Sequence, residues 1–215
     1  KGPISVAQMF YGLRQVTEGR DVSLLQVPLS YNPQSWHFRH PLDYIGTDGG
    51  GGIGSGPGLS IGAALALMNS GRLPIAVFGD GNFMMGCSAI WTAVHYNIPV
   101  MIVVANNQSF YNDELHQERV ARMRNRPVEN KWIGQRMDNP ELDLATVARG
   151  QGAVGFGPVK DATERCCHLL LPMGGAIWPY WLSETAFASK AGGRLYILRI
   201  VFSMSSPVTW RISMR

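Results

Sequence analysis

The sequence predicts a doubly wound α/β domain, with a mainly parallel sheet and helices on both of its faces. Two nearly unbroken aliphatic runs, at 75–78 and 100–105, are typical of strands that are covered on both sides. Segments with helical spacing of apolar residues alternate with these runs, as in a parallel sheet with crossover helices. The chain has 215 residues, 46% of them hydrophobic and 16% charged, so it can bury the core of one globular domain.

The first part of the chain is expected to alternate between two helices, one strand and two irregular segments. Apolar residues recur at helical spacing in the first helix, and small residues dominate the second. Pro28 follows the short apolar run between them and predicts where that strand ends. The expected order is a helix at 4–18, a strand at 22–27, a loop at 29–44, a glycine-rich turn at 49–58 and a helix at 60–69.

The rest of the domain is predicted to continue the alternation of strands and helices. The expected order is a strand at 75–78, a helix at 84–96, a strand at 100–105, helices at 113–126 and 143–151, and a short strand at 153–156. We therefore assign residues 1–160 to one domain. Residues 161–215 form a poorly patterned continuation, which could complete the same domain with a helix at 183–191 and a strand at 195–202.

Composition and charge exclude several classes of function. The formal net charge is +4, with four arginines, Arg119, Arg122, Arg124 and Arg126, on one predicted helix. We interpret them as a solvated face, with a contact to an anionic substrate or a subunit partner as the alternative. No aromatic residues interleave with them, which argues against nucleic acid as a partner. The most apolar stretch, 169–182, contains two prolines and is too short to cross a membrane.

The cysteines and the start of the chain bear on the expected location. Three cysteines, two of them adjacent, give neither a disulfide framework nor a metal-binding spacing, and no signal-peptide pattern opens the chain. Both observations favour a reducing, cytoplasmic location.

Polar groups follow the two aliphatic strands. Gly79-Asp80-Gly81 comes directly after the first, and Asn106-Asn107 after the second. Because the carboxyl ends of parallel strands meet at one edge of a sheet, these groups should lie together. Mg²⁺ prefers oxygen ligands, and the Asp80 carboxylate, the Asn107 side chain and the carbonyl of Ser109 can supply three beside a diphosphate. We expect Gly79 and Gly81 to leave room for phosphate, with a helix starting near 82–84 that directs its N–H groups at it.

This segment resembles the signature of thiamine-diphosphate (ThDP) enzymes, in which Gly-Asp-Gly and Asn-Asn follow successive strands at this spacing. A second match supports the first. The turn Gly52-Ile53-Gly54-Ser55-Gly56, which leads into Ile61-Gly62-Ala63, is similar to the pyrimidine-binding turn of the acetolactate synthase and pyruvate decarboxylase group. The resemblance implies that Ile53 props the cofactor into a bent shape, and that the Ile53 N–H and the Gly51 carbonyl bind its aminopyrimidine ring. The alternatives are a core role for Ile53 and a dinucleotide-binding glycine motif, which lacks its preceding strand and acidic partner.

Further contacts are expected around this site. The resemblance places another diphosphate-contacting loop after the first strand, which makes Ser30 a candidate, and Asn82 is one at the start of the predicted helix. Phe110 and Tyr111 follow the Asn-Asn pair and are candidates for lining the thiazolium ring, with simple packing as the alternative.

The resemblance covers about residues 1–160 and implies a partner. The glutamate that activates the cofactor in this family belongs to a pyrimidine-binding domain, which we expect in cis or in trans, in a homo-oligomer. We therefore expect Mg²⁺–ThDP binding without turnover by this chain alone. The assembled enzyme would act on a small 2-oxo acid by decarboxylation or carboligation, as an acetolactate synthase-like lyase or transferase. The alternatives are a non-catalytic or truncated ThDP-binding module, an acyl-CoA lyase or decarboxylase, and a flavin-using oxidase that would need a further domain.

Overall fold

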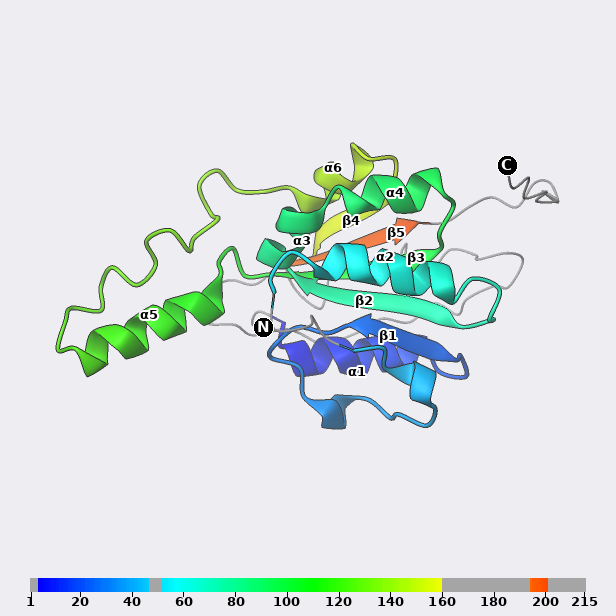
Figure 1. Ribbon diagram of the computed structural model, residues 1–215, viewed down its shortest axis with the longest axis horizontal. Helices are drawn as coiled ribbons and strands as arrows, with labels where there is room; N and C mark the ends of the chain where they lie inside the picture. Colours follow the sequence, from blue (N-terminus) through cyan, green and yellow to red (C-terminus); the bar gives the residue numbers. More distant parts are fainter. Residues whose placement is uncertain (1–3, 47–51, 160–193, 201–215) are drawn as a thin grey trace, which may run out of the picture.

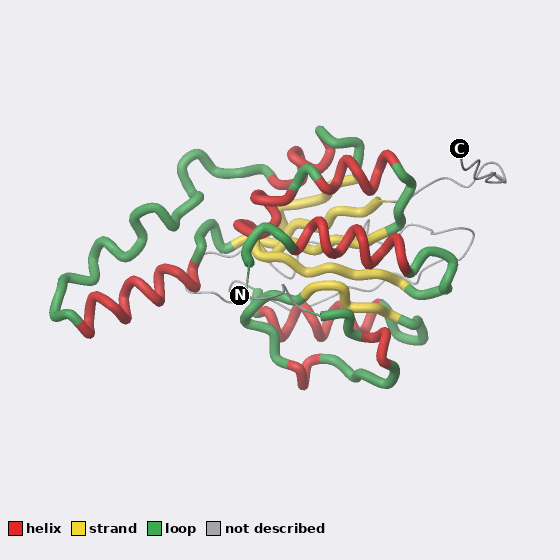
Figure 2. Tube along the Cα trace, in the orientation of Figure 1, coloured by secondary structure: helices red, strands yellow, loops and turns green. Residues whose placement is uncertain are grey.

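The computed structural model describes residues 4–46 and 52–159 and the backbone of 194–200, which together form an open sheet with helices packed on it (Figures 1 and 2). The sheet has five strands in the order β1-β2-β3-β5-β4. The strands are β1 (Val22–Gln26), β2 (Leu73–Gly79), β3 (Val100–Asn106), β4 (Val154–Val159) and β5 (Arg194–Ile200). The α-helices are α1 (Val6–Val16), α2 (Gly56–Ala66), α3 (Asp80–Gly86), α4 (Ala89–His95), α5 (Tyr111–Met123) and α6 (Leu144–Arg149), with 3₁₀ turns η1 (Pro33–Ser35) and η2 (Pro41–Asp43).

The sheet is mainly parallel, which confirms the predicted fold class. β1 pairs with β2 and β2 pairs with β3, both in parallel. β5 pairs antiparallel with both β3 and β4, so β4 runs in the same direction as β1, β2 and β3. Among the described strands, β5 alone runs against the others. It contains most of the strand expected at 195–202, while the helix expected at 183–191 lies outside the described residues.

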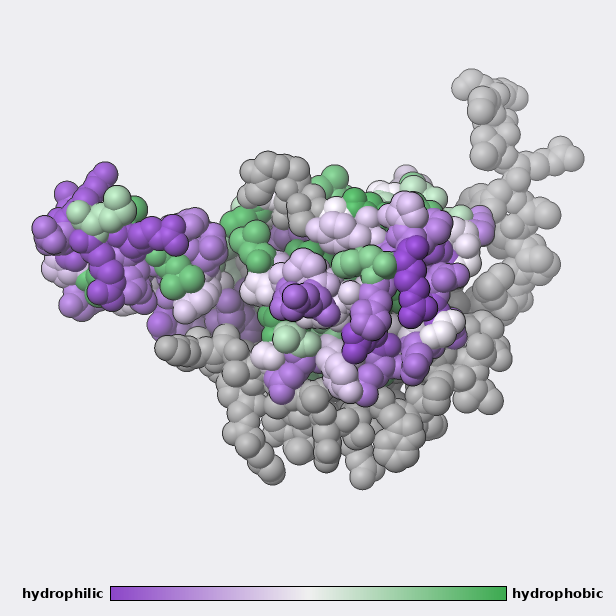
Figure 3. Space-filling view, turned by 90° about the horizontal axis from the view of Figure 1, so that it is seen from below, coloured by the Kyte–Doolittle hydropathy of each residue, from purple (hydrophilic) through white to green (hydrophobic). Residues whose placement is uncertain are grey.

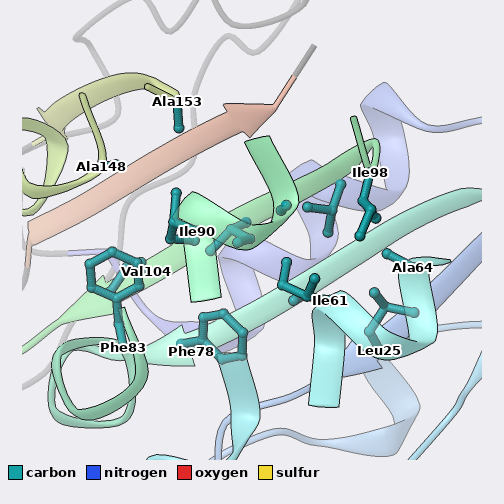
Figure 4. Packing of buried hydrophobic residues seen from close by; sticks show 14 of the residues in the cluster. Leu25, Ile61, Ala64, Phe78, Phe83, Ile90, Ile98, Val104, Ala148 and Ala153 are labelled. Carbon is teal, nitrogen blue, oxygen red and sulfur yellow. The ribbon is translucent and has the colours of Figure 1, made fainter. Parts of the chain in front are cut away.

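Helices cover both faces of the sheet, and the central strands β2 and β3 are buried along nearly their whole length. In β2, Ile75 and Val77 belong to the cluster under α1, whereas Ala76 and Phe78 belong to the cluster under α2, α4 and α6. Figure 4 shows the second cluster, where Phe78 and Ile61 approach from β2 and α2. Each fully buried side chain of this size contributes about 2 kcal/mol, which explains why an aliphatic run without polar positions specifies a central strand.

Local signals set the first two helices. Ser5 caps α1: its side chain accepts the Gln8 N–H at 3.3 Å, and the Gln8 side chain accepts the Ser5 N–H at 3.0 Å. This reciprocal pair satisfies two N–H groups that a helix start leaves without partners. α2 begins at Gly56, four residues earlier than predicted, because Pro57 occupies the first turn, where its fixed φ angle suits a helix.

The prediction of a single helix at 84–96 is wrong, because the chain forms two short helices, α3 and α4. Cys87 and Ser88 join them with ψ angles of −24° and −22°, and the Ile90 N–H donates to the Cys87 carbonyl at 3.0 Å. This is the tighter hydrogen-bonding pattern of a 3₁₀ turn, so the helical register shifts there. α3 also begins directly after β2, which makes Asp80 its first residue.

α5 and the segment that follows it project from the body of the molecule (Figure 1). We call residues 111–137 the arm. Its surface is predominantly hydrophilic (Figure 3), and within α5 only Glu114 is buried. All four arginines expected on a solvated face are exposed. Glu118 forms ion pairs with Arg122, at 2.7 Å, and with Lys131, which joins α5 to the returning segment.

A buried ion pair holds the segment after β1 against the sheet. Arg72 donates to the Val22 carbonyl and to the Ser23 hydroxyl, both at 2.7 Å, and pairs with Asp43. Burial opposes the charge on Asp43, but hydrogen bonds from the N–H groups of Arg39 and His40 and the contact with Arg72 together hold its pKa below the usual value. This interaction fixes the loop next to the amino-terminal end of β1, where Val22 and Ser23 begin the strand.

Tyr31, on the turn after β1, packs its ring against Phe10 with 4.5 Å between ring centroids. Its hydroxyl is buried without a hydrogen-bond partner. Burial, together with the nearby Tyr44, raises the pKa of Tyr31 to about 12. Across the described residues, no helix combines the length and the apolar character needed to cross a membrane.

Candidate functional site

The carboxyl ends of β2 and β3 lie side by side. Gly79, the last residue of β2, is the register partner of Ala105 in the parallel ladder. Asp80 therefore follows β2 at the level where β3 ends in Asn106 and the chain turns through Asn107. The two polar groups that the sequence placed after separate strands thus share one edge of the sheet.

Asp80 is buried, with 3% of its surface exposed. Its Oδ1 accepts the N–H of Gly81 at 3.0 Å, whereas its Oδ2 is buried without any hydrogen-bond partner. Burial raises the pKa of this carboxyl to about 6, although the N–H groups of Gly81, Gln108 and Ser109 act in the opposite direction. Burying a carboxylate oxygen without a partner costs the folded state free energy, and a bound cation would offset that cost. The residues present therefore fit a metal ion.

The turn after β3 is shaped by its asparagine side chains. Asn106 Oδ1 accepts the Gln108 N–H at 2.8 Å, and Asn107 Oδ1 accepts the Ser109 N–H at 3.1 Å. Gln108 has a φ of 59°, in the left-handed region, which bends the chain back beside Asp80. Asn107 is half-buried, and its amide oxygen keeps a second lone pair for a ligand.

Ser109 is buried, and its hydroxyl donates a hydrogen bond to the carboxylate of Glu114, which is also buried. The Glu114 carboxylate lies 3.8 Å from Nε of Arg136. Sequence reasoning missed Glu114, because the helix that carries it is otherwise polar and is half-buried or exposed. One signal could have found it: a carboxylate five residues after a predicted metal ligand can fold back onto that ligand through the first turn of a helix.

Asn82 connects the glycine-rich turn to α3. Its Oδ1 accepts the Gly54 N–H at 2.9 Å, and its side chain fills the space where a Cβ on Gly56 would lie, 2.7 Å away. Gly54 has a φ of +96°, and a Cβ there would come within 2.9 Å of Met85. Only glycine suits this position, because both the backbone angle and the close approach exclude a side chain.

The other residues of the glycine-rich turn are placed as follows. Ile53 is 40% exposed, so it is not a core residue. Gly51 lies outside the described residues. Ser55 donates to the Gly52 carbonyl at 2.8 Å, which closes the turn immediately before α2.

Two glycines beside Asp80 differ in their surroundings. A Cβ on Gly79 would meet nothing within 4 Å, so there is open space for a ligand. A Cβ on Gly81 would lie 2.3 Å from the ring of Phe110. The expectation that Gly81 leaves room for phosphate is therefore wrong. The side chain of Phe110, from the neighbouring turn, occupies the space that a side chain on Gly81 would take. The expected helix start near 82–84 is also corrected, because α3 starts at Asp80.

Two weaker candidates lie at the same edge without a described contact to Asp80. Ser30 is exposed, on a turn closed by a hydrogen bond of 2.9 Å from the Tyr31 N–H to the Pro28 carbonyl. Tyr111 is the first residue of α5 and is 39% exposed. Within the described part of the chain, no three His, Cys, Asp or Glu side chains form a cluster that could hold a metal, so a metal here would depend on amide, carbonyl and diphosphate oxygens.

Comparisons with known proteins show enzymes to which parts of this chain are similar. The acetolactate synthase catalytic subunit of Aspergillus candidus is 29% identical over 134 residues, which is 62% of this chain and 18% of that protein. Acetolactate synthase 2 of Brassica napus is 33% identical over 75 residues, 35% of this chain and 12% of that protein. Benzoylformate decarboxylase of Pseudomonas aeruginosa is 29% identical over 119 residues, 55% of this chain and 20% of that protein. The matches thus span a fifth or less of these relatives.

Solved structures show the same fold. Benzoylformate decarboxylase from Polynucleobacter necessarius superposes with a TM-score of 0.56 at 24% identity, over 69% of this chain and 27% of that chain. The thiamine diphosphate-dependent 4-hydroxybenzoylformate decarboxylase of Rhodococcus jostii gives a TM-score of 0.53 at 26% identity, over 69% and 26% of the two chains. Residues 30–168, more than half of the chain, match the family model described as "Thiamine pyrophosphate enzyme, C-terminal TPP binding domain". The chain therefore belongs to the thiamine pyrophosphate enzyme family, as a C-terminal TPP binding domain.

Proposed function

We propose that this chain binds Mg²⁺ and thiamine diphosphate at the carboxyl edge of β2 and β3, as the diphosphate-binding part of an enzyme that acts on 2-oxo acids. The observation that carries the proposal is the unpaired, buried Oδ2 of Asp80 beside the turn after β3. A magnesium ion would give that oxygen a partner and would favour the charged form of the carboxyl group.

Three residues would hold the metal. Asp80 supplies a charged oxygen, Asn107 an amide oxygen and Ser109 a main-chain carbonyl oxygen, while the diphosphate and water complete the oxygen set that Mg²⁺ prefers. The open space beside Gly79 supports an approach of phosphate to the backbone at that point.

The cofactor's other contacts follow from the glycine-rich turn. Ile53 is exposed on that turn, and Asn82 attaches the turn to α3, the helix that begins with Asp80. Gly51 would let the ring approach the backbone, while Gly54, which packs against Met85, would hold the turn in the shape that presents Ile53 to the cofactor. Ser30 and Tyr111 are proposed as outer contacts of the diphosphate and of the thiazolium ring, respectively.

The reaction class is proposed from the relatives, two groups of which are named for reactions of this kind: acetolactate synthases and benzoylformate decarboxylases. When bound, thiamine diphosphate supplies a carbon nucleophile that can attack a carbonyl group. The residues described here would bind and orient it. Activation would require a glutamate from a pyrimidine-binding domain, in cis or in trans, within an oligomer.

Calorimetry tests the binding proposal. The wild-type chain should bind thiamine diphosphate when Mg²⁺ is present and should lose this binding when EDTA is added. Asp80→Asn, which keeps the size and shape of the side chain, should lower the affinity by about 100-fold or more, because a charged ligand is lost. Asp21→Asn changes an exposed aspartate and is the matched control. Equal affinities for wild type and Asp80→Asn would refute the metal assignment.

A second experiment separates an enzyme part from a non-catalytic module. The chain alone should not decarboxylate a 2-oxo acid, whereas addition of a pyrimidine domain from an acetolactate synthase should produce activity if this is an enzyme part. Cofactor binding without activity in that mixture would favour the non-catalytic module. Turnover by the isolated chain would contradict the need for a second domain.

A further inference from the structure

The turn that carries the proposed metal ligands is held from two sides by the arm. On one side, the Glu114 N–H donates to the Phe110 carbonyl at 3.2 Å, at the start of α5. On the other, the Phe110 N–H donates to the Gln135 carbonyl at 2.9 Å, and the Met137 N–H donates to the Gln108 carbonyl at 2.8 Å. The outgoing and returning ends of the arm therefore both attach to residues 108–110.

Within the arm, the side chain of Glu114 contacts the side chain of Ser109. It is the buried residue of a helix that is otherwise half-buried or exposed, and 5% of its side chain is accessible. Its carboxylate accepts the hydroxyl hydrogen of Ser109 and is balanced by Arg136 at 3.8 Å. Burying a carboxylate costs free energy. If the contact with Ser109 served only to stabilise the fold, an apolar side chain could fill the same space at a lower free-energy cost.

We propose that Glu114 is a positioning residue, which fixes the peptide of Ser109 so that its carbonyl is directed at the magnesium ion, and which thereby couples the metal site to the arm. This inference rests on the proposed function. The reason is geometric: Ser109 has a single side-chain rotation, so anchoring its hydroxyl on Glu114 restricts the adjoining main chain. Partners that orient a metal ligand in this way typically alter metal affinity by about 10- to 100-fold when removed.

The test compares two substitutions at Glu114 in the full chain. Glu114→Leu removes the acceptor, and the Mg²⁺ concentration that half-saturates thiamine diphosphate binding should rise by about 10-fold or more. Thiamine diphosphate affinity should recover at saturating Mg²⁺, because the lost orientation affects the metal. Glu114→Gln keeps an acceptor oxygen for Ser109 and should remain within about 3-fold of wild type. A merely structural role would weaken binding equally at all Mg²⁺ concentrations.

Two further variants complete the design. Glu118→Leu, one turn further along α5, removes the ion pairs within the arm and should leave the Mg²⁺ requirement unchanged. Ser109→Ala keeps the main-chain carbonyl and removes the hydroxyl donor, so it should reproduce the effect of Glu114→Leu. It also provides the comparison if Glu114→Leu does not fold.

Hydrogen exchange of residues 111–137 gives a readout independent of the binding titration. Mg²⁺ with thiamine diphosphate should slow exchange in the arm of the wild-type chain, and this protection should be lost in Glu114→Leu, because coupling between two sites is reciprocal. A wild-type Mg²⁺ requirement in both Glu114→Leu and Ser109→Ala would overturn this inference and leave the proposed function intact. Absence of cofactor binding by the wild-type chain would overturn both.

Discussion

Asp80→Asn is expected to stabilise the metal-free chain although it removes a proposed metal ligand. Burial raises the pKa of the Asp80 carboxyl from 3.8 to about 6, so ionisation at neutral pH costs the folded state free energy. A difference of about two pH units corresponds to about 3 kcal/mol. Asparagine keeps an oxygen for the Gly81 N–H, but it buries an amide hydrogen at the position of the unpaired Oδ2, at a cost of about 1–2 kcal/mol. The net gain should be about 1–2 kcal/mol at pH 8.

The gain depends on pH in a defined direction. Below pH 3.8 Asp80 is protonated in both the folded and the unfolded chain, and its charge has no effect on stability. Between pH 3.8 and about 6 the unfolded chain loses the proton first, so the stability of the wild-type chain falls as the pH rises. Above this window the penalty is constant. At pH 5 the gain from asparagine should therefore be close to zero.

Urea unfolding followed by circular dichroism at pH 5 and pH 8 measures both effects. The exposed aspartate variant Asp21→Asn should show no comparable gain at either pH. Mg²⁺ with thiamine diphosphate should stabilise the wild-type chain and not Asp80→Asn, so the order of stability should reverse when the ligands are added. A metal-free Asp80→Asn chain that is less stable than wild type at pH 8 would refute the assigned cost of the buried carboxylate.

Three further predictions concern packing and buried polar groups. Gly81→Ala places a methyl group 2.3 Å from the Phe110 ring and should lower the free energy of unfolding by about 1–3 kcal/mol, with partial recovery in a Phe110→Ala background; urea titration measures both, and additive losses would argue against this contact. Arg72→Met leaves Asp43 buried without its cation and should cost about 3 kcal/mol at pH 7. Because the pKa of Asp43 is lowered, that deficit should shrink as the pH falls below 4, and a loss independent of pH would indicate packing instead. Tyr31→Phe removes an unpaired buried hydroxyl and should be neutral or stabilising by about 1 kcal/mol at pH 8. Since the pKa of Tyr31 is raised from 10.0 to about 12, the wild-type chain should lose stability between these pH values by more than the variant does, as thermal unfolding at pH 8 and 11 can show.

The sheet could be predicted because its central strands are covered on both faces, so successive residues of each strand are apolar. Ile75 and Val77 pack under α1 while Ala76 and Phe78 pack under α2, so the apolar run at 75–78 predicted the central part of β2, which extends from Leu73 to Gly79. The direction of β5 was not predictable. Strand direction depends on which neighbours are free in the folded sheet, and local sequence carries no information about that.

The site was predictable where it follows from strand ends and was missed where it follows from tertiary contacts. Asp80 and Asn107 could be brought together because both follow parallel strands. The start of α3 at Asp80 was hidden by the flanking glycines, which disfavour a helix in isolation. Glu114 was missed because its burial results from the arm folding back on Ser109, and α5 considered alone is polar on nearly all sides.

The position of β5 between β3 and β4 has a consequence for how the chain is made. β1, β2 and β3 can pair as they leave the ribosome, but β4 finds its described strand partner only after residues 194–200 have been synthesised. Insertion of β5 between β3 and β4 is thus a late step in folding. A chain interrupted before that point would present one edge of β3 and an unpartnered β4, and such edges recruit strands from other molecules. Premature termination should therefore produce an aggregation-prone product rather than a smaller stable domain.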